Sequence, residues 1–453
     1  MAGTITQTTD DMTVQGDWEV TVAAGDSNVV TVAQSGSGKI VKKGGGYLVL
    51  RKNSTFTGGV ELQEGFLMAD PDADAGTSGT VNCTALGTGD VTILGQREDY
   101  TGYCELGIMG AGSNDTRIVT VANNIHVTGN STETYPALVI YGQNSVLTGK
   151  ITADQDFIFW DDNNSVYAIY KGQYDRYKKI LSCTFGEIEA AGKIGFSGFT
   201  RFVFGGKVTT PKLDLTILRQ RRSYDVSGVY MGTSGNMHGA IVFATPCAIG
   251  EIVDNRRYLY CAAANVLPGT LLRHADINGS STYNNLLMYG FSPATAYNQT
   301  LGGLVSDPLE DSSTADWKVA CSGSNATALT LTGIAPDEGE TEKELVTSSN
   351  INGAMYLTVN AYDGFTQTVS NRTHTISKTI RVQKGAFRAA GLAKFSGLTA
   401  ITVDAGASFL HDSAAAAAFP ALKNLTVEGR FVVVKAVPDG TVNVADDERR
   451  ISV

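Results

Sequence analysis

The residues best suited to contact a ligand lie between positions 160 and 177. Tyr167, Tyr170, Tyr174 and Tyr177 recur at offsets of 3, 4 and 3, the spacing of one helical face. Tyrosine rings offer apolar faces with a polar edge, and carboxylates accept hydrogen bonds from hydroxyl groups, so the segment fits a sugar. The alternative is a short helix that packs its tyrosines against a core. The candidate ligand-binding residues are Trp160, Asp161, Asp162, Tyr170, Tyr174, Arg176 and Tyr177.

A second candidate is a calcium loop at 70–76, DPDADAG, in which Asp70, Asp72 and Asp74 alternate. Carboxylates in this order are Ca²⁺ ligands in EF-hand loops, which also need glycine directly after the third acid and glutamate at position twelve. Here Ala75 intervenes and Val81 stands at position twelve. The alternative is a solvated corner loop. Apart from Ca²⁺, no cofactor is expected.

No motif in the chain identifies a reaction. The five histidines are scattered, and a surface or hydrogen-bonded histidine is the favoured interpretation of each. His274 with Asp276 has the residue types of an orienting pair, but no nucleophile is attached to it. A polysaccharide-cleaving enzyme would need paired carboxylates, with arginines to neutralise uronate groups. The middle of the chain offers these residue types: Asp161, Asp162, Asp214, Asp254, Arg219, Arg221, Arg256 and Arg257.

Composition and charge narrow the partners. The net charge is −10 and the isoelectric point about 5.1, which disfavours nucleic acid because phosphate binding needs a basic face. No apolar run is long enough to span a membrane. The chain has 51 glycines but only 10 prolines, a balance that suits tightly turned β-structure.

The elements that must position these residues are short strands. Between Lys42 and Ile93, β-rich pieces alternate with glycine turns, which is the pattern of strands and turns. No piece is long enough to form a sheet with its own core, so each must lie against a neighbouring copy. The expected strands are Tyr47–Leu50, Val60–Leu62, Phe66–Met68 and Val91–Ile93.

This stretch resembles the passenger-associated β-strand repeat of autotransporter-like bacterial surface proteins. That repeat reads K-x-G-x-G-x-L-x-L, then N-T-Y-T-G-G, V-x-x-G-x-L and L-G-x-G-x-V. One extra residue, Ser54, interrupts the second part. The resemblance implies a β-solenoid at the cell surface. The matching residues are Lys42, Gly44, Gly46, Leu48, Leu50, Asn53, Thr55, Phe56, Thr57, Gly58, Gly59, Leu62, Gly65, Leu67, Leu86, Gly87, Gly89 and Val91.

The repeats continue beyond this stretch. A weaker copy occupies 138–157, and near the C-terminus Gly385, Gly406 and Gly429 recur with a period in the low twenties. Fixed periods indicate stacked repeats. We therefore predict an all-β, right-handed parallel β-helix with a less regular middle. The expected divisions are 1–41 for a cap and first rungs, 42–159 and 299–453 for regular solenoid, and 160–298 for an irregular middle with aromatic and basic insertions.

The first residues show neither the basic nor the apolar region of a leader peptide, so an exported protein would have its leader missing from this chain. The six cysteines are far apart and form no CxxC pair. Buried free thiols are expected, with a Cys247–Cys261 disulfide as the alternative.

We expect an extracellular or cell-surface structural and adhesive β-solenoid whose side wall binds a glycan or another ligand on a host or cell surface. We expect that this segment does not insert into a membrane. The sequence is compatible with both a monomer and an oligomer. One alternative is a polysaccharide lyase or glycoside hydrolase on a β-helix, with its site in the middle section. The other is a trimeric phage fibre or spike.

Overall fold

The computed structural model shows a chain made of short strands joined by turns. Two compact units divide between Ala240 and Ile241, inside the section that the sequence predicts to be irregular. The structure describes residues 5–8, 12–70, 78–110, 117–132, 134–141, 144–161, 182–197, 201–216, 240–254, 258–275, 285–288, 296–307, 317–321, 325–415 and 418–433.

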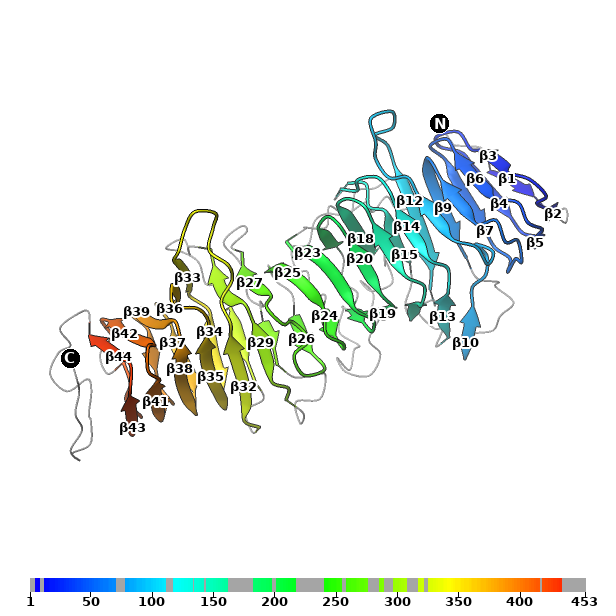
Figure 1. Cartoon of the computed structure of the whole chain (residues 1–453). Coiled ribbons are helices and arrows are strands. Elements are labelled where there is room, and N and C mark those ends of the chain that lie inside the picture. Colours follow the sequence, from blue (N-terminus) through cyan, green and yellow to red (C-terminus); the bar gives the residue numbers. More distant parts are fainter. Residues whose placement is uncertain are drawn as a thin grey trace. The chain divides into compact units, whose positions relative to one another are not determined.

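In the N-terminal unit, successive turns of the chain stack their strands into parallel sheets (Figure 1). The first sheet contains β3 (Trp18–Thr21), β6 (Ile40–Lys43), β8 (Val60–Leu62), β11 (Val91–Ile93), β14 (Ile125–Val127), β17 (Ile151–Ala153), β20 (Ile188–Ala190) and the start of β23 (Val208–Asp214).

The second sheet of this unit holds the strands that follow those of the first along the chain. It contains β1 (Ile5–Thr8), β4 (Ser27–Val30), β7 (Tyr47–Leu50), β9 (Gly65–Ala69), β12 (Cys104–Met109), β15 (Leu138–Tyr141), β18 (Phe157–Asp161), β21 (Ile194–Ser197) and the end of β23.

A third sheet is formed by strands that lie between the second and the first sheet along the chain. It contains β10 (Thr80–Asn82), β13 (Ile118–Val121), β16 (Ser145–Leu147), β19 (Ser182–Phe185) and β22 (Arg201–Phe204), while β2 (Met12–Thr13) pairs with β5 (Gln34–Ser35) in the first turns.

The C-terminal unit is also built from parallel strands that stack from one turn to the next. Strand β24 (Ala240–Phe243) contains the division between the units. The first of its sheets contains β25 (Ala248–Asp254), β27 (Leu271–His274) and β30 (Gly303–Ser306). The second contains β26 (Tyr258–Cys261), β28 (Asn285–Leu287), β31 (Lys318–Ala320), β34 (Asn350–Gly353), β37 (Thr373–Ile376) and β40 (Lys394–Phe395).

Two further sheets complete the C-terminal unit. One contains β29 (Gln299–Leu301), β32 (Thr327–Leu331), β35 (Met355–Asn360), β38 (Thr379–Lys384), β41 (Ala400–Val403) and β43 (Asn424–Val427). The other contains β33 (Lys343–Thr347), β36 (Phe365–Ser370), β39 (Ala386–Gly391), β42 (Ser408–Ser413) and β44 (Arg430–Val433).

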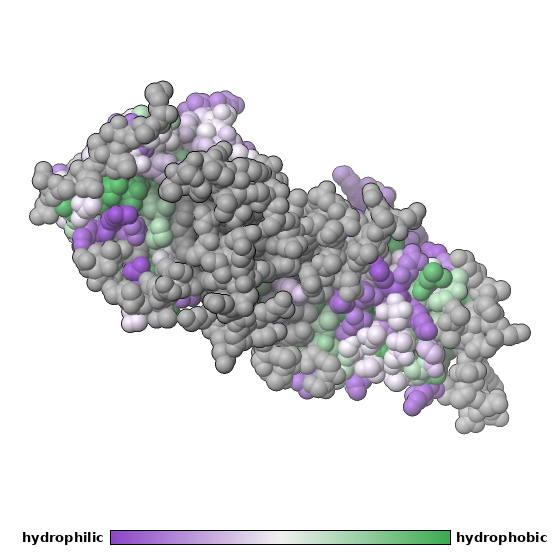
Figure 2. All heavy atoms as spheres, turned by 180° about the vertical axis from the view of Figure 1, so that it is seen from behind, coloured by the Kyte–Doolittle hydropathy of each residue, from purple (hydrophilic) through white to green (hydrophobic). Residues whose placement is uncertain are grey.

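Each unit is therefore built as a parallel β-helix, as the repeats predict. The described residues contain no helix, and the strand pairs that join the sheets are parallel. Strands such as β8 and β32 alternate buried and half-buried residues, because one side chain in two points into the stack. The face drawn in Figure 2 carries small apolar areas between hydrophilic and neutral ones.

Residues one predicted period apart near the C-terminus lie opposite each other on neighbouring strands. Phe387 lies opposite Phe409, and Phe409 opposite Phe431. Their ring centroids are 5.5 and 5.2 Å apart. The glycines Gly385 and Gly406 have φ angles of +79° and +82°, a conformation that glycine adopts without strain. One aromatic residue per rung thus fills this part of the core.

The lysine and glycines of the repeat motif form one corner. Lys42 is fully buried, and its ammonium donates hydrogen bonds to the carbonyl oxygens of Lys43 (2.9 Å), Gly44 (2.6 Å) and Glu64 (3.0 Å). Burial lowers the Lys42 pKa to about 8. A side chain at Gly46 would place its Cβ 2.2 Å from the Ala23 carbonyl oxygen. The motif therefore joins a corner of one rung to the rungs beside it.

Candidate side-wall trough

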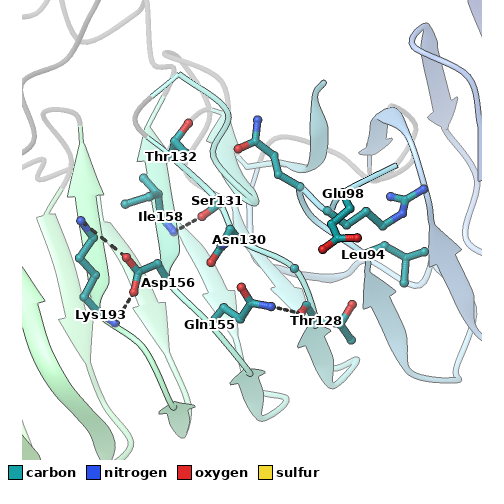
Figure 3. Close-up of a pocket in the computed structure, with 13 residues that line it drawn as sticks. Leu94, Glu98, Thr128, Asn130, Ser131, Thr132, Gln155, Asp156, Ile158 and Lys193 are labelled. Carbon is teal, nitrogen blue, oxygen red and sulfur yellow. Dashed lines mark hydrogen bonds and ion pairs between the residues drawn. The ribbon is translucent and has the colours of Figure 1, made fainter. Parts of the chain in front are cut away.

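A polar trough runs along the corner between the first and second sheets of the N-terminal unit (Figure 3). It has a volume of about 720 Å³. Its residues come from the corners before four successive strands of the second sheet, β12, β15, β18 and β21, except Ile158, which lies within β18. The lining consists of Leu94, Gln96, Arg97, Glu98, Thr128, Gly129, Asn130, Ser131, Thr132, Gln155, Asp156, Ile158 and Lys193.

The corner at 94–103 forms one wall of the trough. Arg97 and Tyr100 exchange backbone hydrogen bonds of 2.9 and 3.1 Å, and the guanidinium carbon of Arg97 lies 5.3 Å from the Tyr100 ring centroid. Arg97 Nη1 also donates to the Gln63 carbonyl oxygen at 2.9 Å. A cation held over an aromatic ring and tied to the previous rung is preorganised. This wall is therefore rigid before any ligand binds.

The corner at 128–137 forms the next wall and is joined to the first. Gln96 and Asn130 exchange backbone hydrogen bonds of 2.8 and 3.1 Å. Gly129 stands where the two corners meet, and a Cβ there would lie 2.0 Å from the Leu94 carbonyl oxygen. Only glycine allows this approach of two backbones. The wall therefore depends on Gly129.

The floor of the trough carries an ion pair and an amide. Asp156 Oδ1 accepts a hydrogen bond of 3.0 Å from the Lys193 backbone N–H, and Lys193 Nζ lies 3.7 Å from Asp156 Oδ2. Gln155 Nε2 donates to the Thr128 carbonyl oxygen at 3.4 Å, as Figure 3 shows. Gln155 is exposed. Its amide can exchange the long bond for a ligand without leaving a buried group unsatisfied.

The charges of the lining balance. The lining contains two cations, Arg97 and Lys193, and two carboxylates, Glu98 and Asp156. Arg97 Nε lies 2.7 Å from Asp99 Oδ1, and Lys193 Nζ lies within 4.0 Å of both Asp156 and Asp214, so no unpaired cation of the lining attracts a polyanion. Amide, hydroxyl and paired charged groups together offer many donors and acceptors. The arrangement suits a ligand rich in hydroxyl groups and without charge of its own.

Of the sequence-predicted binding residues, only Trp160 and Asp161 belong to described strands. Trp160 is 4 % exposed on β18, and the backbone of Asp161 pairs with Ile140 at the end of that strand. Asp162, Tyr170, Tyr174, Arg176 and Tyr177 lie outside the described residues, so the predicted tyrosine site stays a prediction.

Of the predicted calcium ligands, Asp70 is described and pairs with Arg51, the Nε···Oδ2 distance being 3.0 Å. Asp72 and Asp74 lie outside the described residues, so the calcium site also stays a prediction. Within the part of the chain that the structure describes, no cluster of three histidine, cysteine or acidic side chains could hold a metal ion.

One buried cluster has the residue types of a hydrolytic triad. Asp254 lies beside His274 on the neighbouring strand, and His274 Nδ1 is 2.6 Å from Ser349 Oγ. Sequence spacing did not reveal Ser349, which is 75 residues from His274. The three side chains are at most 1 % exposed, so a substrate cannot reach the hydroxyl. Burial lowers the His274 pKa to about 3. The cluster is therefore part of the buried core and not an active site.

The trough itself was missed because its residues match no motif. The signal in the sequence is the length of the turns. Ile40 lies opposite Val60, Val60 opposite Val91 and Val91 opposite Ile125. The second and third of these turns are each more than half as long again as the first. Part of the added length forms the two corners that wall the trough.

Comparison with known proteins identifies no similar protein. No family model matches the chain, and neither the curated proteins nor the solved structures contain a match. Among the described residues, no helix is long and apolar enough to cross a membrane. The fold and the trough together define the class as a parallel β-helix protein with a polar side-wall groove.

Proposed function

We propose that this chain is a structural and adhesive β-solenoid of a cell surface, which binds a glycan through the side-wall trough of its N-terminal unit. The observation that carries the proposal is the trough, whose rigid, charge-balanced walls offer donors and acceptors on four successive corners. Sugars are recognised by such polar groups, since each hydroxyl both donates and accepts.

The test is a glycan array probed with the whole protein and with the variant Asn130→Ala/Gln155→Ala. Both side chains are exposed in the trough, so their removal should leave the fold intact. The intact protein should bind uncharged glycans, and the variant should bind about tenfold more weakly for each hydrogen bond lost. The control Gln383→Ala changes an amide on β38 of the other unit and should bind as the intact protein does.

The predicted tyrosine segment is a rival location for the same function. A Tyr170→Ala/Tyr174→Ala variant separates the two. If it abolishes binding while Asn130→Ala/Gln155→Ala has no effect, the glycan site belongs to the tyrosine segment and the trough proposal is wrong. Absence of binding to every glycan would leave a purely structural role.

One observation favours the trimeric phage fibre as a second candidate. All six cysteines are free and buried, and unpaired thiols persist in reducing compartments more readily than in oxidising ones. A fibre assembled in the cytoplasm before release would keep them reduced. Native mass spectrometry tests this candidate, because a fibre of this kind should have the mass of three chains and a monomer would contradict it.

A further inference from the structure

A row of aromatic side chains lies on the outer surface of the N-terminal unit, one on each of four successive rungs. The centroid of Tyr47 is 4.3 Å from that of Phe66, which is 4.9 Å from Tyr103, and Tyr103 is 4.4 Å from Tyr135. Tyr47 is 40 % exposed and the other three are half-buried. We call these four residues the aromatic row.

The aromatic row and the trough share their supports. Tyr103 and Tyr135 belong to the two corners that wall the trough, and Tyr135 exchanges backbone hydrogen bonds of 3.0 and 3.1 Å with Thr132, a lining residue. Tyr100, which carries the Arg97 guanidinium, donates its hydroxyl proton to the Tyr103 carbonyl oxygen at 2.8 Å. The two features are therefore adjacent at β12 and β15.

The geometry of the aromatic row decides which surfaces a sugar could touch. Tyr47 and Phe66 are nearly parallel, at 8°, so each ring covers a face of the other and solvent reaches mainly edges. Tyr135 is inclined by 64° to Tyr103, which turns its ring out of the stack. Beside the row, the register partners Val49 and Met68 are half-buried on the outer face of β7 and β9. Apolar contact is therefore available at Tyr135, Met68, Val49 and the exposed part of Tyr47 at the end of the row.

The row begins at β7 and the trough ends at the corner before β21, so together they span six successive strands of the second sheet. We call the row and the trough together the lane. Because neighbouring strands lie ~4.8 Å apart, the lane is ~24 Å long. The row supplies apolar surface and the trough supplies hydrogen-bonding groups, the two kinds of contact that a sugar chain needs. A single sugar would occupy only a fraction of this length.

We propose that the ligand is an extended, uncharged polysaccharide that lies along the solenoid axis, with its hydroxyl groups in the trough and the C–H faces of further sugars against the aromatic row, Val49 and Met68. This inference rests on the proposed function, whose site it extends. It predicts that the affinity grows with the length of the sugar chain until the sugars cover the aromatic row. It also predicts that substitutions in the trough weaken binding of every oligosaccharide, whereas substitutions in the row weaken binding of the long ones only.

The experiment measures affinity by titration calorimetry with the whole protein. The probes are cello-, chito- and malto-oligosaccharides, each from dimer to hexamer. The trough variant is Asn130→Ala/Gln155→Ala. The row variant is Tyr47→Ala/Met68→Ala, which removes one ring of the aromatic row and the Met68 side chain beside it. Tyr356→Ala is the matched control, since Tyr356 is 43 % exposed on β35 of the C-terminal unit.

The expected result is that the trough variant weakens binding of every length by tenfold or more, whereas the row variant weakens hexamer binding about tenfold and leaves the shortest binding oligomer unchanged. Equal affinity of row variant and intact protein for hexamers would overturn the lane while leaving the trough proposal in place. Binding of no oligosaccharide by the intact protein would overturn both. Tyr135→Phe, which keeps the ring, should bind hexamers as the intact protein does, and Tyr135→Ala should not.

Discussion

The last rungs of the C-terminal unit and the turns from β8 to β14 of the N-terminal unit show what happens when a β-solenoid keeps its period and when it does not. In the C-terminal unit, Tyr356, Thr379, Ala400 and Asn424 are successive register partners, and the three turns between them have nearly the same length. In the N-terminal unit, the turns from β8 to β11 and from β11 to β14 are both longer than any of those three. The described trough lies where the period is broken. A regular rung stabilises its neighbours, and an enlarged corner adds polar surface to the side wall.

The units also differ in which ionisable groups they bury. The N-terminal unit buries Lys42, which donates to three carbonyl oxygens. The C-terminal unit buries His274, His374 and His411. A buried base resists protonation because the charged form loses its hydration. The stability of the two units should therefore respond to pH in different ranges.

The largest expected effect concerns the phenylalanine stack of the C-terminal unit. Phe409 is fully buried between Phe387 and Phe431, so Phe409→Ala should lower the free energy of unfolding of this unit by about 3–5 kcal/mol. Phe66→Ala removes a half-buried ring on the outside of the N-terminal unit and should cost about 1–2 kcal/mol. Hydrogen exchange read by mass spectrometry reports each unit separately; equal losses would contradict the distinction between core and outer stacks.

A further pH effect concerns the contribution of Lys42 to the stability of the N-terminal unit at alkaline pH. Because the Lys42 pKa is about 8 in the folded chain and 10.5 when unfolded, the unfolded chain binds more protons between these values. The contribution of Lys42 to the free energy of unfolding should therefore rise with pH through this window, by up to ~3 kcal/mol. Burial raises the pKa of Cys83 and Cys104 from 9.0 to about 11, so these thiols oppose the rise above pH 9. The Lys42 contribution is the difference between the intact protein and a variant without this amine. Urea unfolding at a series of pH values measures it.

The matched variants isolate that contribution. Lys42→Met should remove the alkaline rise, since no titrating group is left at the site. Lys43→Met, one residue further along and paired at the surface with Glu19, should keep it. A rise of the same size in both variants would show that Lys42 is not its source.

Acid is expected to lower the stability of the C-terminal unit. Burial lowers the pKa of both His274 and His374 to about 3, below the ordinary 6.5. The unfolded chain takes up protons as the pH falls through 6.5 and the folded chain does not, so stability falls as pH drops from 6.5 towards 3. Each histidine should account for about 2 kcal/mol between pH 7 and pH 5.

The double variant His274→Gln/His374→Gln should flatten this acid response when the unfolding of the C-terminal unit is followed by hydrogen exchange. His126→Gln is the control, because the His126 side chain is 41 % exposed in the N-terminal unit. An unchanged acid slope in the double variant would mean that other groups carry it.

The positions of many strands could be predicted from residue order alone. The strands expected at Tyr47–Leu50, Val60–Leu62 and Val91–Ile93 have those bounds in the structure, and Phe66–Met68 lies inside β9. Glycine turns and alternating apolar residues act over a few neighbours, so they are visible locally. The burial of Lys42 within β6 was not predicted, because its three acceptors include a carbonyl on the next rung.

Residue types and their short spacings determined that this chain forms stacked parallel strands, that Phe387, Phe409 and Phe431 recur one per rung, and where glycine turns the backbone. The tertiary structure alone decided that Gln96 meets Asn130, that Asp156 meets Lys193, and that Tyr47, Phe66, Tyr103 and Tyr135 form one row. The physical reason is that a turn depends on adjacent dihedral angles, whereas neighbours across rungs depend on how many residues each corner inserts before the next strand pairs.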